Sequence, residues 1–193
     1  MKQGIIIATH RNFKPWLVNF IKTYDHKYDL LFVFNTDESN RYDPQAVIAG
    51  IESNYDEFLV LHDTMEIKDN SLFDIIFEEH KGKSVYFRQH SCMFLAKFTK
   101  TDLSKLPADT IKRLYDIVDK NGAVKEEGAF NVEYMAVSNP VYLFNELSDS
   151  GEREQKFGRK NMVLENQYIK KYKGAWNMEL VEKSKTYIPT WEE

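Results

Sequence analysis

The stretch GIIIATHRN at residues 4–12 decides the fold class of this chain. Its first five residues form an unbroken apolar run, which is typical of a strand that is buried on both faces of a sheet. The run stops at the polar residues Thr9, His10 and Arg11. Pro15 follows closely, and proline is favoured in the first turn of a helix. The stretch therefore predicts a buried strand, a polar loop and then a helix.

Two similar segments follow along the chain. Residues 30–34 and 58–61 are apolar runs that end in the polar triplets Asn35-Thr36-Asp37 and His62-Asp63-Thr64. A helix is expected between them, from Pro44 to about Ser53. Strands that alternate with helices in this way are typical of right-handed crossovers in a parallel sheet. The sequence therefore predicts an α/β protein with a Rossmann-like, open, mostly parallel sheet flanked by helices and a short C-terminal extension.

The rest of the chain is expected to complete this architecture. Residues 1–147 are interpreted as one α/β domain, and residues 148–193 as a C-terminal loop or helix that begins with a polar, turn-rich stretch. The pattern over residues 126–135 does not decide between helix and strand. Further helices are expected at 71–80 and 109–120, and further strands at 84–87, 93–98 and 141–144.

The composition excludes some classes of function. The chain has 193 residues, 42% of them hydrophobic, and a net charge of −4. Proteins that coat nucleic acids through phosphate contacts are usually basic, so that class is disfavoured. Residues 153–185 nevertheless contain nine Lys or Arg residues and four acidic ones. This local basic segment is either a solvated face or a clamp for phosphates.

The single cysteine and the hydropathy pattern indicate the compartment. Cys92 has no intrachain partner, so neither a disulfide nor a cysteine-based zinc site is expected. The apolar run near the N-terminus is too short for the core of a signal peptide. No stretch approaches the length of a membrane span. We therefore expect no membrane span and a cytoplasmic protein.

The polar residues that end the three predicted strands should converge on one crevice, because ligands of open α/β sheets bind outside the carboxyl ends of the strands. No glycine-rich dinucleotide turn follows the first strand and no P-loop is present. Asp63 directly follows a buried strand, where a carboxylate can hold a divalent cation against a diphosphate, with His62 or Glu66 completing the site. The alternative is that Asp63 caps the next helical turn.

Several segments, in their order along the chain, resemble one enzyme family over about residues 3–178. They are the first strand with its loop (5–11), LHDT (61–64), the apolar strand before a Leu-Pro turn (93–107), EEGAFN (126–131), NMVLENQYI (161–169) and KGAW (173–176). This order is similar to that in glycosyltransferases of the A-type fold, in particular the small family-2-like enzymes.

The resemblance implies transfer of a sugar from a nucleotide-diphosphate sugar, a UDP-sugar first, to a hydroxyl acceptor by direct displacement. The acceptor would be a glycan, a protein, a small molecule or a modified nucleic-acid base. Mn²⁺ or Mg²⁺ would assist, and residues 148–193 would close over the donor. The implied residues are Thr9, His10, Arg11, Asn35, Asp37, Lys171, Lys173 and Trp176 for the donor, Asp63 and His62 for the metal, and Glu127 and then Glu126 as the catalytic base.

The sequence departs from the family pattern at the metal motif. The family commonly has Asp-x-Asp, whereas residues 62–64 are His-Asp-Thr and contain one carboxylate. Lys171 and Lys173 would then share the neutralisation of the diphosphate. The rival interpretation of Glu126 and Glu127 is that they meet the dipole at a helix start.

Two other functions stay open. A nucleotidyltransferase would use the same crevice, but it normally needs a first loop rich in glycine and basic residues, and residues 9–14 contain no glycine. A non-catalytic module with a glycosyltransferase-like fold would explain the missing second aspartate. Trp176 likewise either stacks on the donor or packs in the core.

Overall fold

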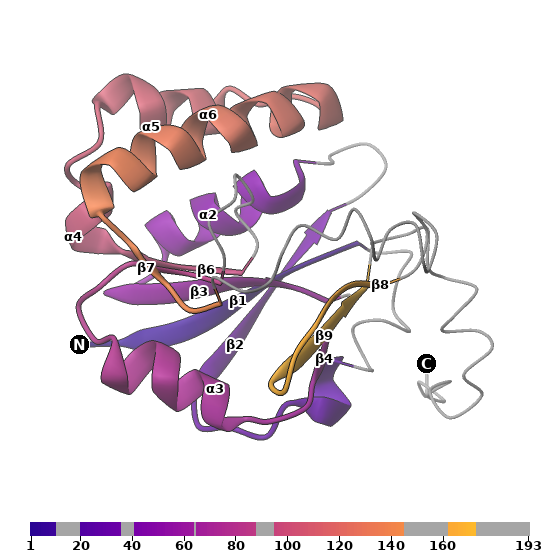
Figure 1. Ribbon diagram of the computed structural model, residues 1–193. Helices are drawn as coiled ribbons and strands as arrows, with labels where there is room; N and C mark the ends of the chain where they lie inside the picture. Colours follow the sequence, from indigo (N-terminus) through magenta and orange to yellow (C-terminus); the bar gives the residue numbers. More distant parts are fainter. Residues whose placement is uncertain (11–19, 36–40, 64, 88–94, 145–161, 173–193) are drawn as a thin grey trace.

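The computed structural model describes residues 1–10, 20–35, 41–63, 65–87, 95–144 and 162–172. Its centre is a six-stranded open sheet with the order β2-β1-β3-β6-β5-β7 (Figure 1). The strand β6 runs antiparallel to β3 and β5, and the other pairings are parallel. The strands are β1 (Gln3–His10), β2 (Asp29–Asn35), β3 (Glu57–His62), β5 (Val85–Tyr86), β6 (Ala96–Thr99) and β7 (Val141–Tyr142).

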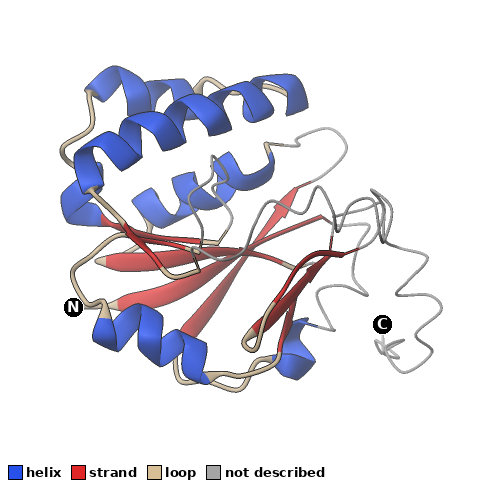
Figure 2. Ribbon diagram, in the orientation of Figure 1, coloured by secondary structure: helices blue, strands red, loops and turns tan. Residues whose placement is uncertain are grey.

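Helices cover both faces of this sheet (Figure 2). One face carries α2 (Tyr42–Glu52), α4 (Lys100–Leu103), α5 (Ala108–Tyr115) and α6 (Lys120–Ser138), and the other carries α3 (Ser71–Asp74) continued by the π-helical turn η1 (Ile75–Glu79). Side chains alternate between the faces along each strand. Ile6 and Val60 therefore pack under α2, whereas Ile7 and Leu61 pack under α3. The predicted α/β class with a mostly parallel sheet flanked by helices is confirmed.

A second, smaller sheet lies beside the end of β3. It consists of β4 (Met65–Ile67), β9 (Ile169–Tyr172) and β8 (Met162–Glu165), in the order β4-β9-β8. The hairpin of β8 and β9 is the described part of the expected C-terminal segment, and its pairing with β4 attaches it to the chain just beyond Asp63. The other residues of 148–193 lie outside the described residues.

The helices after residue 107 differ from the expected ones. The helix expected at 109–120 ends at Tyr115, and a new helix begins at Lys120, where the Asp119 side chain accepts the Gly122 backbone N–H at 2.8 Å. The undecided stretch 126–135 is the interior of this 19-residue helix. The dipole acts within the first turn only. The interpretation of Glu126 and Glu127 as residues at a helix start is therefore wrong.

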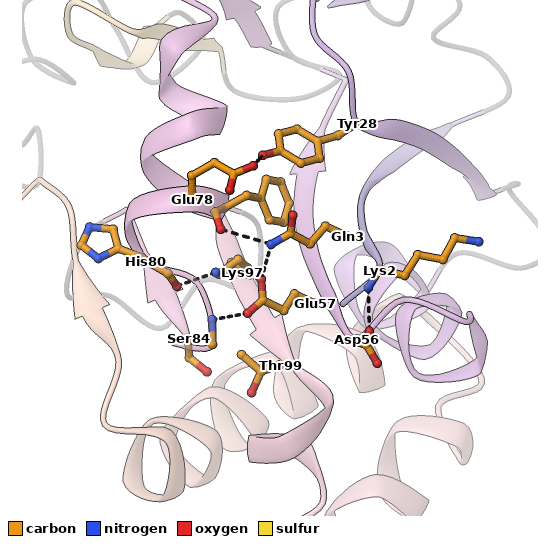
Figure 3. Close-up of polar contacts among 12 residues, drawn as sticks. Lys2, Gln3, Tyr28, Asp56, Glu57, Glu78, His80, Ser84, Lys97 and Thr99 are labelled. Atoms are coloured by element: carbon orange, nitrogen blue, oxygen red, sulfur yellow. Dashed lines mark hydrogen bonds and ion pairs between the residues drawn. The ribbon is translucent and has the colours of Figure 1, made fainter.

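An ion pair that no sequence pattern predicts lies at the amino end of β3 (Figure 3). Lys97 Nζ is 3.3 Å from Glu57 Oε2, and neither side chain is more than 1% exposed. Lys97 also donates to the His80 carbonyl at 2.8 Å, and Glu57 accepts from the Gln3 amide and the Gly82 backbone N–H. Burial lowers the pKa of Lys97, against the opposing effect of Glu57. The pair therefore ties β1, β3, β6 and the turn after η1 together.

Two tyrosine hydroxyls are buried between α6 and the sheet. Tyr86 donates to Asn131 Oδ1 at 2.7 Å, and Tyr134 lies 2.7 Å from Ser84 Oγ and accepts the Thr99 backbone N–H at 3.1 Å. Burial raises the pKa of both tyrosines well above the usual value. Both phenols therefore stay protonated in the folded chain at a pH where they ionise in the unfolded chain.

The protein is expected to lose stability above about pH 10. A group whose pKa is raised by folding stabilises the fold below its unfolded pKa, and this stabilisation is lost as the pH rises towards the folded pKa. Tyr134→Phe removes one such group. Between about pH 9 and about pH 11.5 both proteins should lose free energy of unfolding. The loss in Tyr134→Phe should be smaller than that in the wild type by about 1–2 kcal/mol. Urea unfolding across this range measures the difference, and parallel losses in both proteins would contradict the prediction.

None of the helices in the described part of the chain is long and apolar enough to cross a bilayer.

Candidate functional site

The sheet order creates a switch point at the carboxyl end of β1. The strand β1 lies between β2 and β3 and is parallel to both, so the carboxyl ends of all three strands share one edge. The chain passes from β2 on one side of β1 to β3 on the other side. In open α/β sheets the crevice outside such a point is where ligands bind.

A buried hydrogen bond joins the ends of β1 and β3 at this switch point. Thr9 Oγ1, at the end of β1, donates to Asp63 Oδ2, directly after β3, at 2.6 Å. The two residues are 4% and 6% exposed, and the Asp63 backbone N–H donates to the Ala8 carbonyl at 3.3 Å. The chain enters the extended strand β4 at Met65. The alternative that Asp63 caps a helical turn is therefore wrong.

Asn35 links the end of β2 to the same edge of the sheet. Its side chain is buried, its amide donates to the Thr9 carbonyl at 3.3 Å, and its Oδ1 accepts the Arg41 backbone N–H at 3.0 Å. Asn35 thus holds the end of β2 against β1 and positions the start of α2. The structure brings Thr9, Asn35 and Asp63, three of the predicted site residues, into one hydrogen-bonded cluster.

His62 does not join Asp63, although the two are adjacent in sequence. His62 faces α2, where its Nε2 contacts Oδ1 of the buried Asp43 in the first turn of that helix. The cause is strand alternation, which turns successive side chains to opposite faces. Within the residues that the structure describes, no group of three or more His, Cys, Asp or Glu side chains is placed to hold a metal ion.

The predicted donor residues are only partly described. The backbone of Lys171 is opposite Met65 in the pairing of β4 with β9, and Met65 follows Asp63 by two residues in the chain. The backbone of His10 pairs with that of Asn35 at the end of β1. The side chains of these two residues are not described, and the predicted donor residues Arg11, Asp37, Lys173 and Trp176 lie outside the described residues.

The two predicted catalytic glutamates lie on α6. Glu126 accepts Arg113 Nε of α5 at 3.0 Å, and Arg113 also pairs with Asp109 and Glu133. The Glu127 carbonyl accepts from Asn131, whose side chain in turn binds the Tyr86 hydroxyl of β5. This turn of α6 therefore lies over β5, which β6 separates from β3. Glu126 contributes to the contact between the two helices.

Sequence reasoning missed Asp43. It precedes Pro44 at the start of the predicted helix. A carboxylate is common at that position because the helix dipole stabilises a negative charge there, so Asp43 does not stand out in the sequence. The signal that was available is the alternation along β3, which turns His62 away from Asp63 and towards the helix that follows β2.

No protein-family model matches this chain, and no curated protein matches it. The function is therefore argued from the cluster of Thr9, Asn35 and Asp63 and from the residues around it.

Proposed function

We propose that this protein is a glycosyltransferase of the A-type fold that moves a sugar from a nucleotide-diphosphate sugar to a hydroxyl acceptor. The observation that carries the proposal is the buried hydrogen bond from Thr9 to Asp63 at the switch point of the sheet. A buried carboxylate is costly unless it is hydrogen-bonded, and the Thr9 hydroxyl supplies one such bond to Asp63. Its place at the ligand-binding edge of an open α/β sheet favours a charged ligand such as a diphosphate with its cation.

A divalent cation, Mn²⁺ or Mg²⁺, is part of the proposal. Asp63 offers one carboxylate, and no metal-binding group of three or more His, Cys, Asp or Glu side chains occurs among the described residues. Mg²⁺ commonly binds through one or two carboxylates together with the phosphates of a substrate. Among the described residues, the set of possible ligands therefore fits a cation that Asp63 shares with the nucleotide sugar. Such a cation neutralises the leaving diphosphate when it is bound.

The neighbouring backbone supports a binding site on this edge. The pairing of β4 with β9 brings Lys171 next to the chain that follows Asp63, and we assign Lys171 and Lys173 to the neutralisation of the diphosphate. Asn35 holds Arg41, at the start of α2, beside the same edge, where the nucleoside of the donor would lie. A UDP-sugar is the first donor to test.

The resemblance assigns the removal of the acceptor proton to Glu127. That role stays a prediction. Its alternate, Glu126, is engaged in an ion pair with Arg113, which makes it the weaker choice of the two.

A non-catalytic module with the same fold is the second candidate. The observation that favours it is the single carboxylate of residues 62–64, because a second one would hold the cation more firmly. Such a module would bind a nucleotide sugar and leave it intact.

Slow hydrolysis of the donor tests the enzymatic proposal. The full chain is expected to release nucleoside diphosphate from sugars of one nucleotide family, and faster with Mn²⁺ than with EDTA. Chromatography of the nucleotides after incubation with UDP-, GDP- and dTDP-sugars measures the release, and CMP-sugars are included for release of the monophosphate. Binding of a donor without release would favour the non-catalytic module.

A further inference from the structure

The two edges of the central sheet differ in length and in composition. The strand β7, at one edge, has two residues and directly follows Pro140, which has no N–H to offer to another strand. The strand β2, at the other edge, has seven residues and pairs with β1 without a break in register. Short strands, prolines and charged side chains protect the edges of sheets against pairing with another chain. The β7 edge has such protection, whereas β2 is a long and regular strand.

The strand β2 is also apolar on both of its faces. Residues 30–34 are Leu-Leu-Phe-Val-Phe, and the one charged residue of the strand, Asp29, is at its beginning. Leu31 is 37% exposed and Phe34 is 52% exposed, and the two side chains point to opposite faces of the strand. Within the part of the chain that the structure describes, no strand pairs with the outer side of β2. The partner that fits such an edge is another apolar strand, which would bind its outer N–H and C=O groups.

We propose that β2 is a dimerisation surface, at which two copies of this chain join their central sheets by antiparallel pairing of β2 with β2. A two-fold axis brings the same strand of both copies together in opposite directions, so the assembly closes after two chains. In the register that follows from the side chains, Phe32 lies opposite Phe32 of the second copy. The inference does not depend on the proposed function.

This register gives each exposed apolar side chain of the strand an apolar neighbour. Leu31 lies opposite Val33 of the second copy, and Phe34 lies opposite Leu30. Directly opposite side chains on one face of an antiparallel pair are close enough to pack together, and aromatic and β-branched pairs stabilise it most. Pairing would therefore cover the two most exposed apolar side chains of β2.

The ends of the strand fit the same register. Asp29 lies opposite the neutral Asn35 of the second copy, so no like charges meet across the interface. A shift by two residues in one direction would place Asp29 opposite Val33, and a shift in the other direction would place Leu31 opposite Asn35. Each shift sets a polar side chain against an apolar one. The sequence of β2 therefore favours pairing centred on Phe32.

Sedimentation velocity of the full chain over a wide range of concentrations tests the dimer. We expect the wild type to sediment as a dimer at the upper end of the range and Leu31→Lys and Phe34→Lys to stay monomeric there, because each lysine places a charge against an apolar side chain of the second copy. Circular dichroism of both variants checks the fold. Val132→Lys is the matched control, because Val132 is 62% exposed on α6, and this variant should dimerise as the wild type does.

Cysteine cross-linking tests the register. With the one native cysteine removed by Cys92→Ser, Phe32→Cys should form a disulfide-linked dimer on mild oxidation. Opposite Cα atoms in an antiparallel pair are about 4.5–5.5 Å apart, which a disulfide can span. Phe34→Cys is the control: position 34 is more exposed than position 32, but its two copies would be four residues, about 13 Å, apart along the interface. It should not cross-link.

Three results would overturn the inference. A wild type that is monomeric at every concentration would do so and would leave the glycosyltransferase proposal intact. Loss of the dimer in Val132→Lys, with both β2 variants still dimeric, would move the interface to α6. Cross-linking of Phe34→Cys in preference to Phe32→Cys would exclude pairing centred on Phe32.

Discussion

The Glu57→Gln variant is expected to lose about 3–5 kcal/mol of its free energy of unfolding. It leaves the ammonium of Lys97, which is fully buried, without the carboxylate that lies 3.3 Å away. The His80 carbonyl and the face of the Phe77 ring remain beside Lys97, but neither carries a compensating charge. Removal of one partner from a buried pair is costly because an unpaired charge stays in a medium of low dielectric constant.

A variant that lacks both partners identifies the cause of this loss. The Glu57→Gln/Lys97→Met variant removes both charges, so it should be more stable than Glu57→Gln alone. Lys105→Met is the control, because Lys105 is half exposed in its pair with Asp102 and should cost less than about 1 kcal/mol. Urea unfolding at neutral pH gives all four free energies. A loss in Glu57→Gln as small as that of the control would show that the buried pair does not hold these strands together.

The Asp63→Asn variant is expected to bind the nucleotide sugar about 100-fold more weakly than the wild type in the presence of Mn²⁺. Asparagine has nearly the same shape, and its carbonyl oxygen can still accept the Thr9 hydroxyl, so the fold should persist. The charge is lost, and with it the ligand that we assign to the cation. Without Mn²⁺ the two proteins should bind the donor with similar affinity.

Isothermal calorimetry with and without Mn²⁺ measures this difference. Asp116→Asn is the matched control, because Asp116 is an exposed residue at the end of α5, away from the switch point. The control should bind the donor as the wild type does. Equal affinities of Asp63→Asn and the wild type in Mn²⁺ would remove Asp63 from the site.

The strands that build the switch point could be predicted because their signals are local. The apolar runs at residues 4–8, 30–34 and 58–61 each fit within β1, β2 or β3, together with the first polar residue that follows each run. Burial on both faces makes the runs of β1 and β3 continuous, and continuous runs are easy to recognise. The strand β2 is an edge strand, in which Leu31 and Phe34 are exposed although the run is just as apolar. The clustering of Thr9, Asn35 and Asp63 then follows from parallel strands sharing one edge.

The features that could not be predicted depend on contacts between distant residues. The pairing of β4 with β9 joins residues about a hundred positions apart through strands of three and four residues, too short to give a period. The pair of Glu57 and Lys97 arises only when β3 meets β6. The sequence around each of these two residues is like that around an exposed charged residue, so no pattern predicts the pair.

The sequence pattern does not predict the helix α6 for a different reason. Its buried residues Ala123, Phe130 and Tyr134 follow the helical repeat, but Val124 and Val132 are exposed and weaken the apolar stripe. A window limited to residues 126–135 contains too few turns to separate the two sets. The separation of His62 from Asp63, in contrast, was predictable from strand alternation alone.

The most direct test of the proposed function is the melting temperature of the full chain against UDP-, GDP-, CMP- and dTDP-sugars, with and without Mn²⁺. A ligand that binds only the folded state raises the melting temperature, by an amount set by its concentration relative to Kd. We expect a rise with one nucleotide family, larger with Mn²⁺ than with EDTA, and no such difference in Asp63→Asn. No shift with any donor, in either condition, would contradict the assignment of this sheet edge to a nucleotide sugar.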